Sequence, residues 1–440
     1  MNFPRMRKVL SAPGLLKKVR ACFDLIPETC DTVPDYPLTD VLMSAMAMFG
    51  LKCGSMLKFD EQRKTEVFQN NLKNPYGVPA SPCDTRIRDR LDPVNPEHLR
   101  PAFKAVHQTL QKQGALRDFV FMEGYYLLNI DGTGMFGSEK IHCIHCCEKH
   151  KRNGKTEYYH QMLEAAIVHP DKTEVLPLCP EPIIREDGKK KNDCERNASK
   201  RLLKNIKEDY PQMKFIVVED GLAGNGPHIR LLLELGYAFI IVAKEDDHKE
   251  LFDHVQKQMC DKRTEEFEKT DEEGVIHGYR FLNGVPLNQS NPDILVNYLD
   301  FWEVDTAGNV KQWVWITCIP LNEETVPQVE KGGRNRWKIE NETFNTLKNQ
   351  GYNLEHNYGH GKQYLSTVFA FLMVLMFLID QAQELSCAMF KAARKQFKSR
   401  TSLWDKIRGL FFNCLIDGWE MLWEVIISGI PARFVFFDTS

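Results

Sequence analysis

The stretch "MKFIVVEDGLAGNGPHIRLLLELG", residues 213–236, decides the fold class. Its apolar run before Asp220 is typical of a buried strand, and a glycine-rich loop and a helical pattern follow. Pro227 near the first turn of this helix and Gly236 near its end mark the helix boundaries. "YAFIIVAK", residues 237–244, predicts another strand. Strands joined through a helix run parallel in one sheet, so the stretch predicts an α/β fold.

Residues upstream of this stretch extend the sheet. Residues 193–211 carry apolar side chains on one face and are expected to form an amphipathic helix. "FMEGYYLLNIDGTG", residues 121–134, is expected to be a strand that ends at Asp131. Two further strands are expected at 138–147 and 157–170, separated by a polar turn. An antiparallel meander followed by parallel strands makes a mixed sheet with helices packed on it.

The rest of the chain divides around this core. Residues 245–330 predict an inserted β-rich subdomain, with strands expected at 274–283, 294–305 and 310–321. The α/β pattern then resumes with a helix over 334–351, ended by Gly351. The most apolar segment, 366–379, is shorter than the roughly 20 residues that span a bilayer, so a buried core helix is expected.

The N-terminal part is expected to be helical. Two short helices around a proline turn at 81–111 resemble a helix-turn-helix, although such pairs are common in any α-rich domain. The expected division is a helical, potentially DNA-binding N-terminal domain (1–115), a first core part (120–244), the β-rich insertion (245–330), a second core part with the glutamate helix (331–385) and a helical tail (386–440).

Composition limits the function classes. Of 440 residues, 43% are hydrophobic and 27% charged, as in soluble globular proteins, and the formal net charge of −3 excludes a generally cationic molecule. Nucleic-acid contacts must therefore come from local basic stretches such as 7–20, 185–201, 331–338 and 391–400. The odd count of 13 cysteines and the lack of a signal peptide predict a reducing, cytoplasmic location.

Asp131 and Asp220 occupy equivalent positions, each after an apolar strand and before glycine. Ligands collect at the carboxyl ends of strands in open α/β sheets, and adjacent carboxylates repel unless a cation neutralises them. Mg²⁺ or Mn²⁺ suits such oxygen ligands. Glu340 is our choice as third acid, because Arg336, Glu340, Phe344 and Lys348 follow steps of four; Glu342 is the alternative. The competing interpretation is ordinary turn chemistry at both aspartates.

The motifs "NIDGTG" (129–134), "VVEDGLAGNGPHI" (217–229) and "RWKIENETFNTLKNQGYNLEHNYGHG" (336–361) resemble the signature of DDE transposases of bacterial insertion sequences. The resemblance covers roughly 120–380, and is closest to the group with an RNase H-like catalytic core and a β-strand insertion between the second Asp and the Glu. It implies that Asp131, Asp220 and Glu340 form the DDE triad. The sequence departs from the family pattern at two points. The family usually has a tyrosine shortly before the arginine, where this chain has Gly332, Gly333 and Arg334. The family also usually has a lysine seven residues after the glutamate, whereas position 347 is leucine here and Lys348 follows it.

The resemblance implies a cut-and-paste DNA transposase. Two Mg²⁺ (or Mn²⁺) ions would bind the triad and support endonuclease cleavage at the transposon ends and strand transfer into target DNA. Arg336, Lys338 and Lys348 are expected to contact DNA phosphates, and Trp337 is expected to pack on the core rather than stack on DNA. The expected partner is double-stranded DNA, bound by a homodimer at the bacterial nucleoid. No association with a membrane is expected. The alternatives are a domesticated metal-dependent nuclease and a non-catalytic DNA-binding protein.

"KIHCIHCCEKHK", from residue 140, concentrates cysteine and histidine. Cys143 and Cys146 have the spacing of a structural zinc knuckle. In a strand, however, Cys143 and Cys147 would share a face and Cys146 would point away, so we favour buried apolar cysteines over zinc. In "HNYGHGK" (356–362), glycines break any helix, so the histidine spacing is not expected to bind metal.

Overall fold

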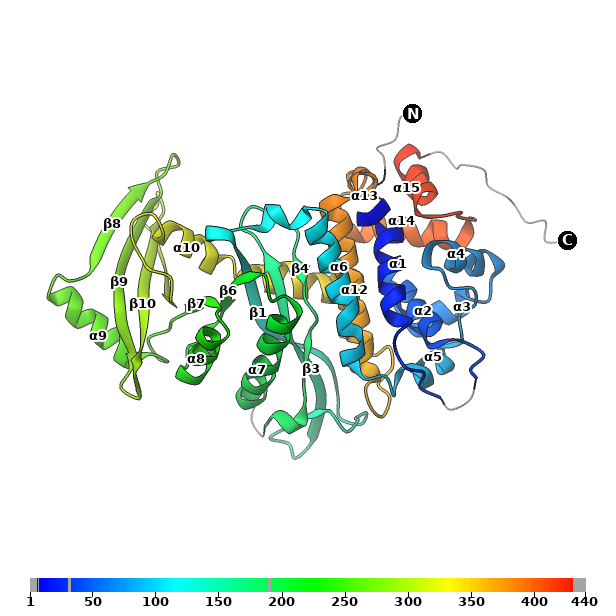
Figure 1. The fold of residues 1–440 in the computed structure, drawn as a ribbon, viewed down its shortest axis with the longest axis horizontal. Coiled ribbons are helices and arrows are strands. Elements are labelled where there is room, and N and C mark those ends of the chain that lie inside the picture. The colour runs from blue at the N-terminus through cyan, green and yellow to red at the C-terminus, as the bar shows by residue number, and fades with distance from the viewer. Residues whose placement is uncertain (1–5, 7, 31–32, 189–190, 430–440) are drawn as a thin grey trace.

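A single mixed sheet runs through most of the molecule (Figure 1). The computed structural model describes residues 6, 8–30, 33–188 and 191–429. The main strand order is β2-β3-β1-β6-β7-β11-β10-β9-β8, with β4 and β5 paired to β3. The strands are β1 (Tyr125–Ser138), β2 (Cys147–His150), β3 (Thr156–Val168), β4 (Leu176–Pro177), β5 (Glu181–Ile183), β6 (Lys214–Glu219), β7 (Ala238–Val242), β8 (Glu265–Thr270), β9 (Ile276–Asn288), β10 (Asn291–Val304) and β11 (Val310–Thr317).

The parallel centre of the sheet has the predicted form. β6 pairs parallel with β1 on one side and with β7 on the other. Helix α7 (Lys191–Asp209) precedes β6, and α8 (Gly226–Glu234) connects β6 to β7. Gly236 adopts φ +75° after α8, a conformation that favours glycine at a helix end. The mixed α/β sheet predicted from residues 121–244 is therefore confirmed.

The predicted meander of the first three strands is wrong in its order. β3 lies between β1 and β2 and pairs antiparallel with both. β1 also continues through Asp131 to Ser138, and residues 139–146 form turns instead of the predicted strand. Ile141 and Ile144, which made this segment resemble a strand, are exposed. The long β1–β3 pairing buries far more apolar surface than residues 139–146 could, and it decides the register.

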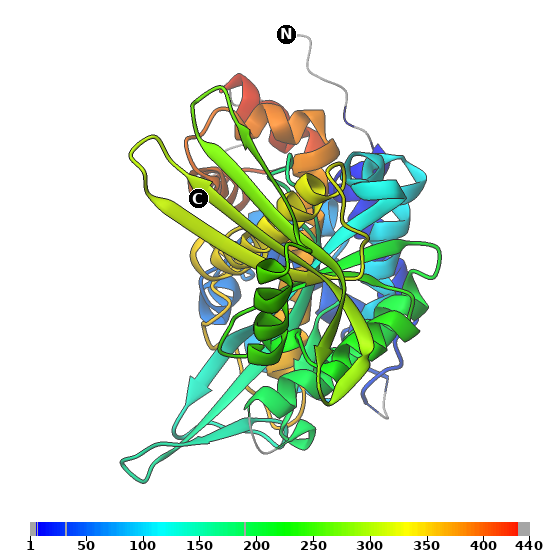
Figure 2. The same cartoon turned by 90° about the vertical axis from the view of Figure 1, so that its left-hand side faces the viewer.

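The β-rich segment extends the same sheet. β9, β10 and β11 occupy the predicted strand regions, and β11 pairs antiparallel with β7. An additional helix, α9 (Lys249–Cys260), leads into β8. The four strands β8 to β11 form the far end of the molecule from the helical part (Figures 1 and 2).

The packing of helix α10 (Val326–Arg334) explains Gly332 and Gly333, which depart from the motif of the transposases that the sequence resembles. A Cβ on Gly332 would come within 2.9 Å of the Ile240 side chain, and one on Gly333 within 2.5 Å of Trp315. Glycine at both positions lets α10 pack closely on β7 and β11. This close approach places the chain that follows, from Arg336 onward, over the end of the sheet.

The helices at the two ends of the sequence pack into one body beside the sheet (Figure 1). For example, the Asn71 side chain donates to the carbonyls of Phe411 and Cys414. The remaining α-helices are α1 (Ala12–Phe23), α2 (Leu38–Gly50), α3 (Met56–Gln62), α4 (Glu66–Tyr76), α5 (Asp84–Leu91), α6 (Arg100–Lys112), α11 (Asn345–Asn349), α12 (Leu365–Ser386), α13 (Ala388–Arg394), α14 (Arg400–Asn413) and α15 (Trp419–Ser428). Residues 430–440 of the predicted tail and residues 189–190 of the basic stretch 185–201 lie outside the described residues.

The short helical turns are η1 (Lys8–Leu10), η2 (Pro96–Leu99), η3 (Ala115–Phe119), η4 (Met122–Gly124), η5 (Arg185–Asp187), η6 (Gly221–Ala223) and the π-helical η7 (Ile339–Phe344). Helix α12 contains the predicted apolar segment. It is long and apolar enough to cross a membrane, yet 94% of its most apolar window is buried within the protein. This confirms the expectation of a buried core helix.

A buried ion pair fixes α12 to the N-terminal helices. The Lys52 ammonium lies 2.6 Å from Asp380 of α12, and both side chains are almost completely buried. The Tyr352 hydroxyl donates to the same carboxylate at 2.5 Å. The Lys52 ammonium also lies 4.1 Å and 4.3 Å from the ring centres of Tyr352 and Trp404. One charge pair thus joins the end of α2, α12, α14 and the loop after α11.

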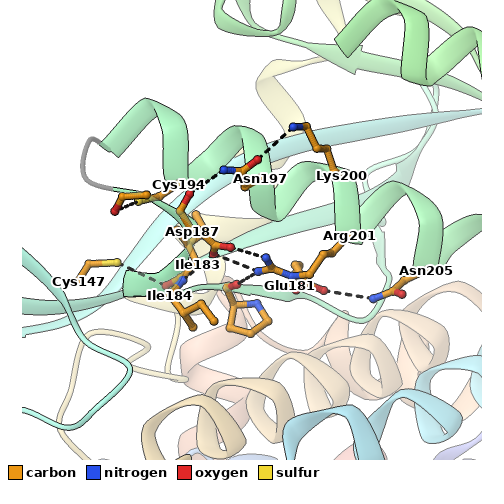
Figure 3. A network of polar contacts seen from close by, with 12 residues as sticks. Cys147, Glu181, Ile183, Ile184, Asp187, Cys194, Asn197, Lys200, Arg201 and Asn205 are labelled. Carbon is orange, nitrogen blue, oxygen red and sulfur yellow. Dashed lines mark hydrogen bonds and ion pairs between the residues drawn. The ribbon is translucent and has the colours of Figure 1, made fainter. Parts of the chain in front are cut away.

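A second polar network holds α7 on the sheet (Figure 3). Arg201 donates to Glu181 of β5 at 2.5 Å, to the Pro182 carbonyl and to Asp187 of η5. Burial raises the pKa of Glu181 to about 7, against the opposing effect of Arg201. Asn205, one turn further along α7, donates to the other Glu181 oxygen. These bonds fix the helix that faces the ends of β1 and β6.

Candidate active site

The parallel register brings Asp131 and Asp220 to the same edge of the sheet. The pairing of β1 with β6 ends where Asn129 lies opposite Val218, and each aspartate is two residues further along its own strand direction. Neighbouring strands lie about 4.8 Å apart, so the two acids are side by side. Asp131 does not end its strand as predicted, because β1 continues in its pairing with β3. Asp131 lies just beyond the part of β1 that pairs parallel with β6.

Glu340 reaches this edge from η7. Arg336, one turn earlier, lies 2.7 Å from Glu340 and 3.3 Å from Asp131, and therefore bridges the two acids. Glu342, the alternative third acid, points to Arg400 at 3.9 Å. The helix predicted over 334–351 is interrupted: α10 ends at Arg334, and the π-helical η7 separates it from α11. Such insertions in helices often occur at functional sites.

The electrostatics of Asp131 reflect this convergence. Burial raises its pKa to about 6, while the Gly132 N–H and Arg336 act in the opposite direction. The charges of Asp220 and Glu340 raise it further. Asp220 and Glu340 thus both act on Asp131, and the guanidinium of Arg336 opposes their effect. A site with this excess of negative charge attracts cations.

Turn chemistry is also present at both aspartates. Asp131 accepts a hydrogen bond from the Gly132 N–H at 2.8 Å, and Asp220 accepts one from the Leu222 N–H at 3.0 Å as it caps η6. Each bond uses one carboxylate oxygen. The turn interpretation and the site interpretation are therefore compatible, because each bond orients a carboxylate and leaves its second oxygen for another partner. For Asp131 that partner is Arg336, whose guanidinium lies 3.3 Å from Oδ2.

A cavity of about 70 Å³ opens beside the two aspartates, against α7 and α8. Its wall includes a buried pair that sequence reasoning missed: His228 of α8 lies 2.6 Å from Glu219, the residue before Asp220. Burial lowers the pKa of His228 and Glu219 raises it, with a net upward shift. Glu195 and Arg196 of α7 also line the cavity. The motif "VVEDGLAGNGPHI" contains both members of this pair, Glu219 as its third residue and His228 as its last but one.

Glu164 is a further acid that the sequence analysis overlooked. It lies opposite Asp131 in the β1–β3 register and is completely buried. Its carboxylate oxygens make no hydrogen bond of normal geometry within the described part of the chain. Burial raises its pKa well above the usual value, and the nearby Ala165 N–H offsets only part of this shift. Glu164 is therefore held as the neutral acid.

Glu164→Gln is expected to change how stability depends on pH. The neutral acid is favoured in the folded state, so Glu164 supports folding below its unfolded pKa of about 4.3 and progressively less as pH rises toward its folded pKa. Glutamine cannot ionise. The free energy of unfolding of the variant, relative to the natural chain, should rise between pH 5 and pH 8 in urea titrations. A difference that is constant over this range would contradict the assignment.

The three cations expected to contact DNA have different environments. Arg336 lies between two of the acids. Lys348 pairs with the exposed Glu355 at 2.8 Å and remains near the surface. Lys338 is buried, and its ammonium donates to the carbonyls of His169 and Pro170 at 2.6 Å and 3.1 Å. It anchors η7 to the loop after β3, so a phosphate contact by Lys338 does not fit the structure.

Trp337 is 47% exposed, contrary to the expectation that it packs on the core. It lies at the start of the bend between α10 and η7, where the backbone turns the indole outward while Lys338 points inward. An exposed aromatic next to an acid-rich edge is a surface on which a base could stack.

Cys143 and Cys146 lie together, with 3.9 Å between their sulfur atoms. The expectation that they point to opposite faces is wrong, because residues 139–146 form turns and not a strand. His160 and His360 complete a cluster with them. His160, which belongs to β3, was not among the predicted ligands, and His360 was not expected to bind metal.

Comparisons with known proteins add a distant likeness. No family model and no curated protein match the chain. Among solved structures, it is similar to piggyBac transposase in a synaptic complex with hairpin DNA, with a TM-score of 0.38 and 10% sequence identity. The match covers 97% of this chain and 81% of that chain. Membership among bacterial insertion-sequence transposases stays a prediction.

Proposed function

We propose that this chain is a DNA transposase that cleaves phosphodiester bonds and transfers DNA strands with the help of divalent metal ions. The observation that supports the proposal is the meeting of Asp131, Asp220 and Glu340 from two adjacent parallel strands and a separate helix, around Arg336. The three motifs that contain these acids are those that resemble DDE transposases. If Asp131 and Asp220 were only turn residues, nothing would require Glu340, more than a hundred residues further along the chain, to lie at the same place.

The donor set fits magnesium or manganese. Carboxylate oxygens are the ligands that these hard cations prefer, and mutual repulsion of the three acids favours a bound dication. Asp131, Asp220 and Glu340 would hold the metal. When bound, two such ions stabilise the entering and leaving oxygens of an in-line displacement at phosphorus.

The chain's own residues prepare the site. The Gly132 and Leu222 N–H groups fix the orientation of Asp131 and Asp220. Arg336 keeps Glu340 next to Asp131 and offers a guanidinium that can move to a phosphate oxygen, since phosphate binds guanidinium as carboxylate does. Lys348 and the exposed Trp337 lie on the same segment and would contact the DNA backbone and an unpaired base.

The proposal implies double-stranded DNA as partner, in the form of transposon ends and target. Pairing two ends requires a DNA-bound homodimer, and the place of action would be the bacterial nucleoid. A metal-dependent nuclease would use the same three acids but would not join a cut end to new DNA. Strand transfer therefore separates these two functions.

The test uses the purified full-length chain with DNA from the two flanks of its own coding region. With Mg²⁺ or Mn²⁺ we expect cleavage at the flanks and, with a target plasmid, covalent joining of the cut 3′ ends; EDTA should prevent both. Cleavage without joining would assign the nuclease function. Absence of metal-dependent cleavage on both flanks, by protein that binds this DNA, would refute the proposal.

A further inference from the structure

A second cluster of chemically reactive side chains lies outside the acid site. Cys143 and Cys146 come from the turns after β1, His160 from β3, and His360 from the loop between α11 and α12. One potential ligand atom from each of the four lies within 4.8 Å of every other. Cys146, His160 and His360 are buried. Two neighbouring segments of the sheet region and a loop about two hundred residues later thus converge on one point.

The distances within the cluster match a metal tetrahedron. With Zn–S of about 2.3 Å and Zn–N of about 2.05 Å, tetrahedral edges are about 3.8 Å for S–S, 3.6 Å for S–N and 3.3 Å for N–N. The two sulfurs are 3.9 Å apart and the two Nε2 atoms 3.2 Å apart. Three of the four sulfur–nitrogen distances are 3.4 Å, 3.5 Å and 3.3 Å. The fourth, between Cys143 and His360, is within 4.8 Å.

Hydrogen bonding alone cannot account for these contacts. The His360 Nδ1 lies 3.3 Å from the Gly361 carbonyl, which can only accept, so Nδ1 holds the proton and Nε2 of the neutral ring has none. Two thiols and the His160 Nε2 then supply at most three protons for five close contacts. A cation bound by deprotonated sulfur and neutral imidazole satisfies all four atoms at once. A backbone carbonyl on the second ring nitrogen is the usual support for a metal-binding histidine.

The loop that presents His360 is built for this position. Gly361 has φ +67°, and a Cβ there would meet the Asp92 carboxylate at 2.1 Å. That carboxylate accepts the N–H groups of Lys362 and Gln363, both at 2.9 Å. The glycines that seemed to exclude a metal site in the sequence are what allow the turn toward Cys146.

We propose that Cys143, Cys146, His160 and His360 bind one structural Zn²⁺ ion. All four ligands come from the protein, as in closed structural zinc sites, so the ion has no open position for catalysis. The ion links two parts of the protein. One is β1, which contains Asp131, with its partner strand β3, and the other is the loop that follows the Glu340 segment. The site is distinct from the acid cluster and does not depend on the proposed DNA chemistry.

The direct test is metal analysis of the purified full-length chain. We expect one zinc per chain, and cobalt substitution should give the intense visible bands of a tetrahedral site together with sulfur-to-cobalt charge transfer. Cys143→Ser and His360→Asn should each lose the metal. The matched controls Cys260→Ser and His142→Asn, which alter an exposed thiol and a neighbouring exposed imidazole, should keep it.

Hydrogen exchange on the natural chain keeps the test decisive if a ligand variant fails to fold. Chelator-stripped natural chain should show faster hydrogen exchange in residues 139–150 and 353–364, with no change in α9, and added Zn²⁺ should reverse this. Natural chain that neither contains nor takes up zinc would overturn the proposal. So would a Cys143–Cys146 disulfide in the freshly purified protein.

Discussion

Glu340→Gln is expected to abolish metal-dependent DNA cleavage, whereas Glu342→Gln, two residues away on the same segment, should leave it nearly unchanged. Glutamine keeps the shape of the side chain but removes the charge that holds a dication. Loss of a metal's contribution of several kcal/mol to the barrier corresponds to a rate reduction of about a thousandfold or more. Glu342 faces Arg400, away from Asp131, and is the natural control.

Asp131→Asn and Asp220→Asn should have the same effect, with Asp171→Asn, an exposed aspartate, as control. Each variant should bind DNA as well as the natural chain, because fewer negative charges at the edge do not weaken phosphate contacts. Cleavage would be followed on labelled flank DNA over a range of Mg²⁺ and Mn²⁺ concentrations. Normal cleavage by any of the three variants, or loss of cleavage in Glu342→Gln alone, would reject the assignment of the acids.

Lys52→Met is expected to have the largest effect on stability. It would leave the carboxylate of Asp380 buried, with Tyr352 and Gln383 as its remaining polar partners among the described residues. Removal of one partner of a buried ion pair costs about 3–5 kcal/mol in the free energy of unfolding. Burial already lowers the pKa of Lys52, and Asp380 raises it, so its charge depends on this partner.

Urea unfolding would measure this loss, with two variants for comparison. Lys64→Met removes an exposed ammonium 3.7 Å from Asp60, which keeps Arg63 as its partner, and should change the free energy of unfolding by less than about 1 kcal/mol. The double variant Lys52→Met/Asp380→Leu should recover most of the loss, because replacing a buried ion pair by apolar groups is often close to neutral. A single variant as stable as the natural chain would show that the pair is not buried in solution.

Much of the fold follows from local sequence patterns. The strand–loop–helix stretch at 213–236 determined the parallel centre of the sheet, and three of the later strands were visible from their apolar and β-branched runs. The order of the first strands could not be predicted, because residues 139–146 and β2 both carry short mixed patterns. Only the long-range pairing of β1 with β3 decides between them, and pairing over such distances leaves no local signal.

The two candidate sites differ in how many of their residues could be predicted from the sequence. Asp131 and Asp220 were predictable because strand ends place both acids at one sheet edge. Glu340 could be chosen from its helical spacing with Arg336 and from the resemblance to known transposases. Its position over the sheet edge could not be predicted, since it depends on the close packing of Gly332 and Gly333 in the preceding helix α10. His160 and His360 lie beside Cys146 only through the tertiary structure, because they come from β3 and from the loop before α12. No spacing rule connects these residues, and the glycines around His360 argued against metal.

The measurement that tests the central claim most directly is the anomalous scattering of manganese in crystals of this chain soaked in Mn²⁺. The account predicts one or two peaks within coordination distance of the carboxylates of Asp131, Asp220 and Glu340, with Arg336 displaced from at least one of them. Manganese bound elsewhere, with these three carboxylates unligated, would contradict it.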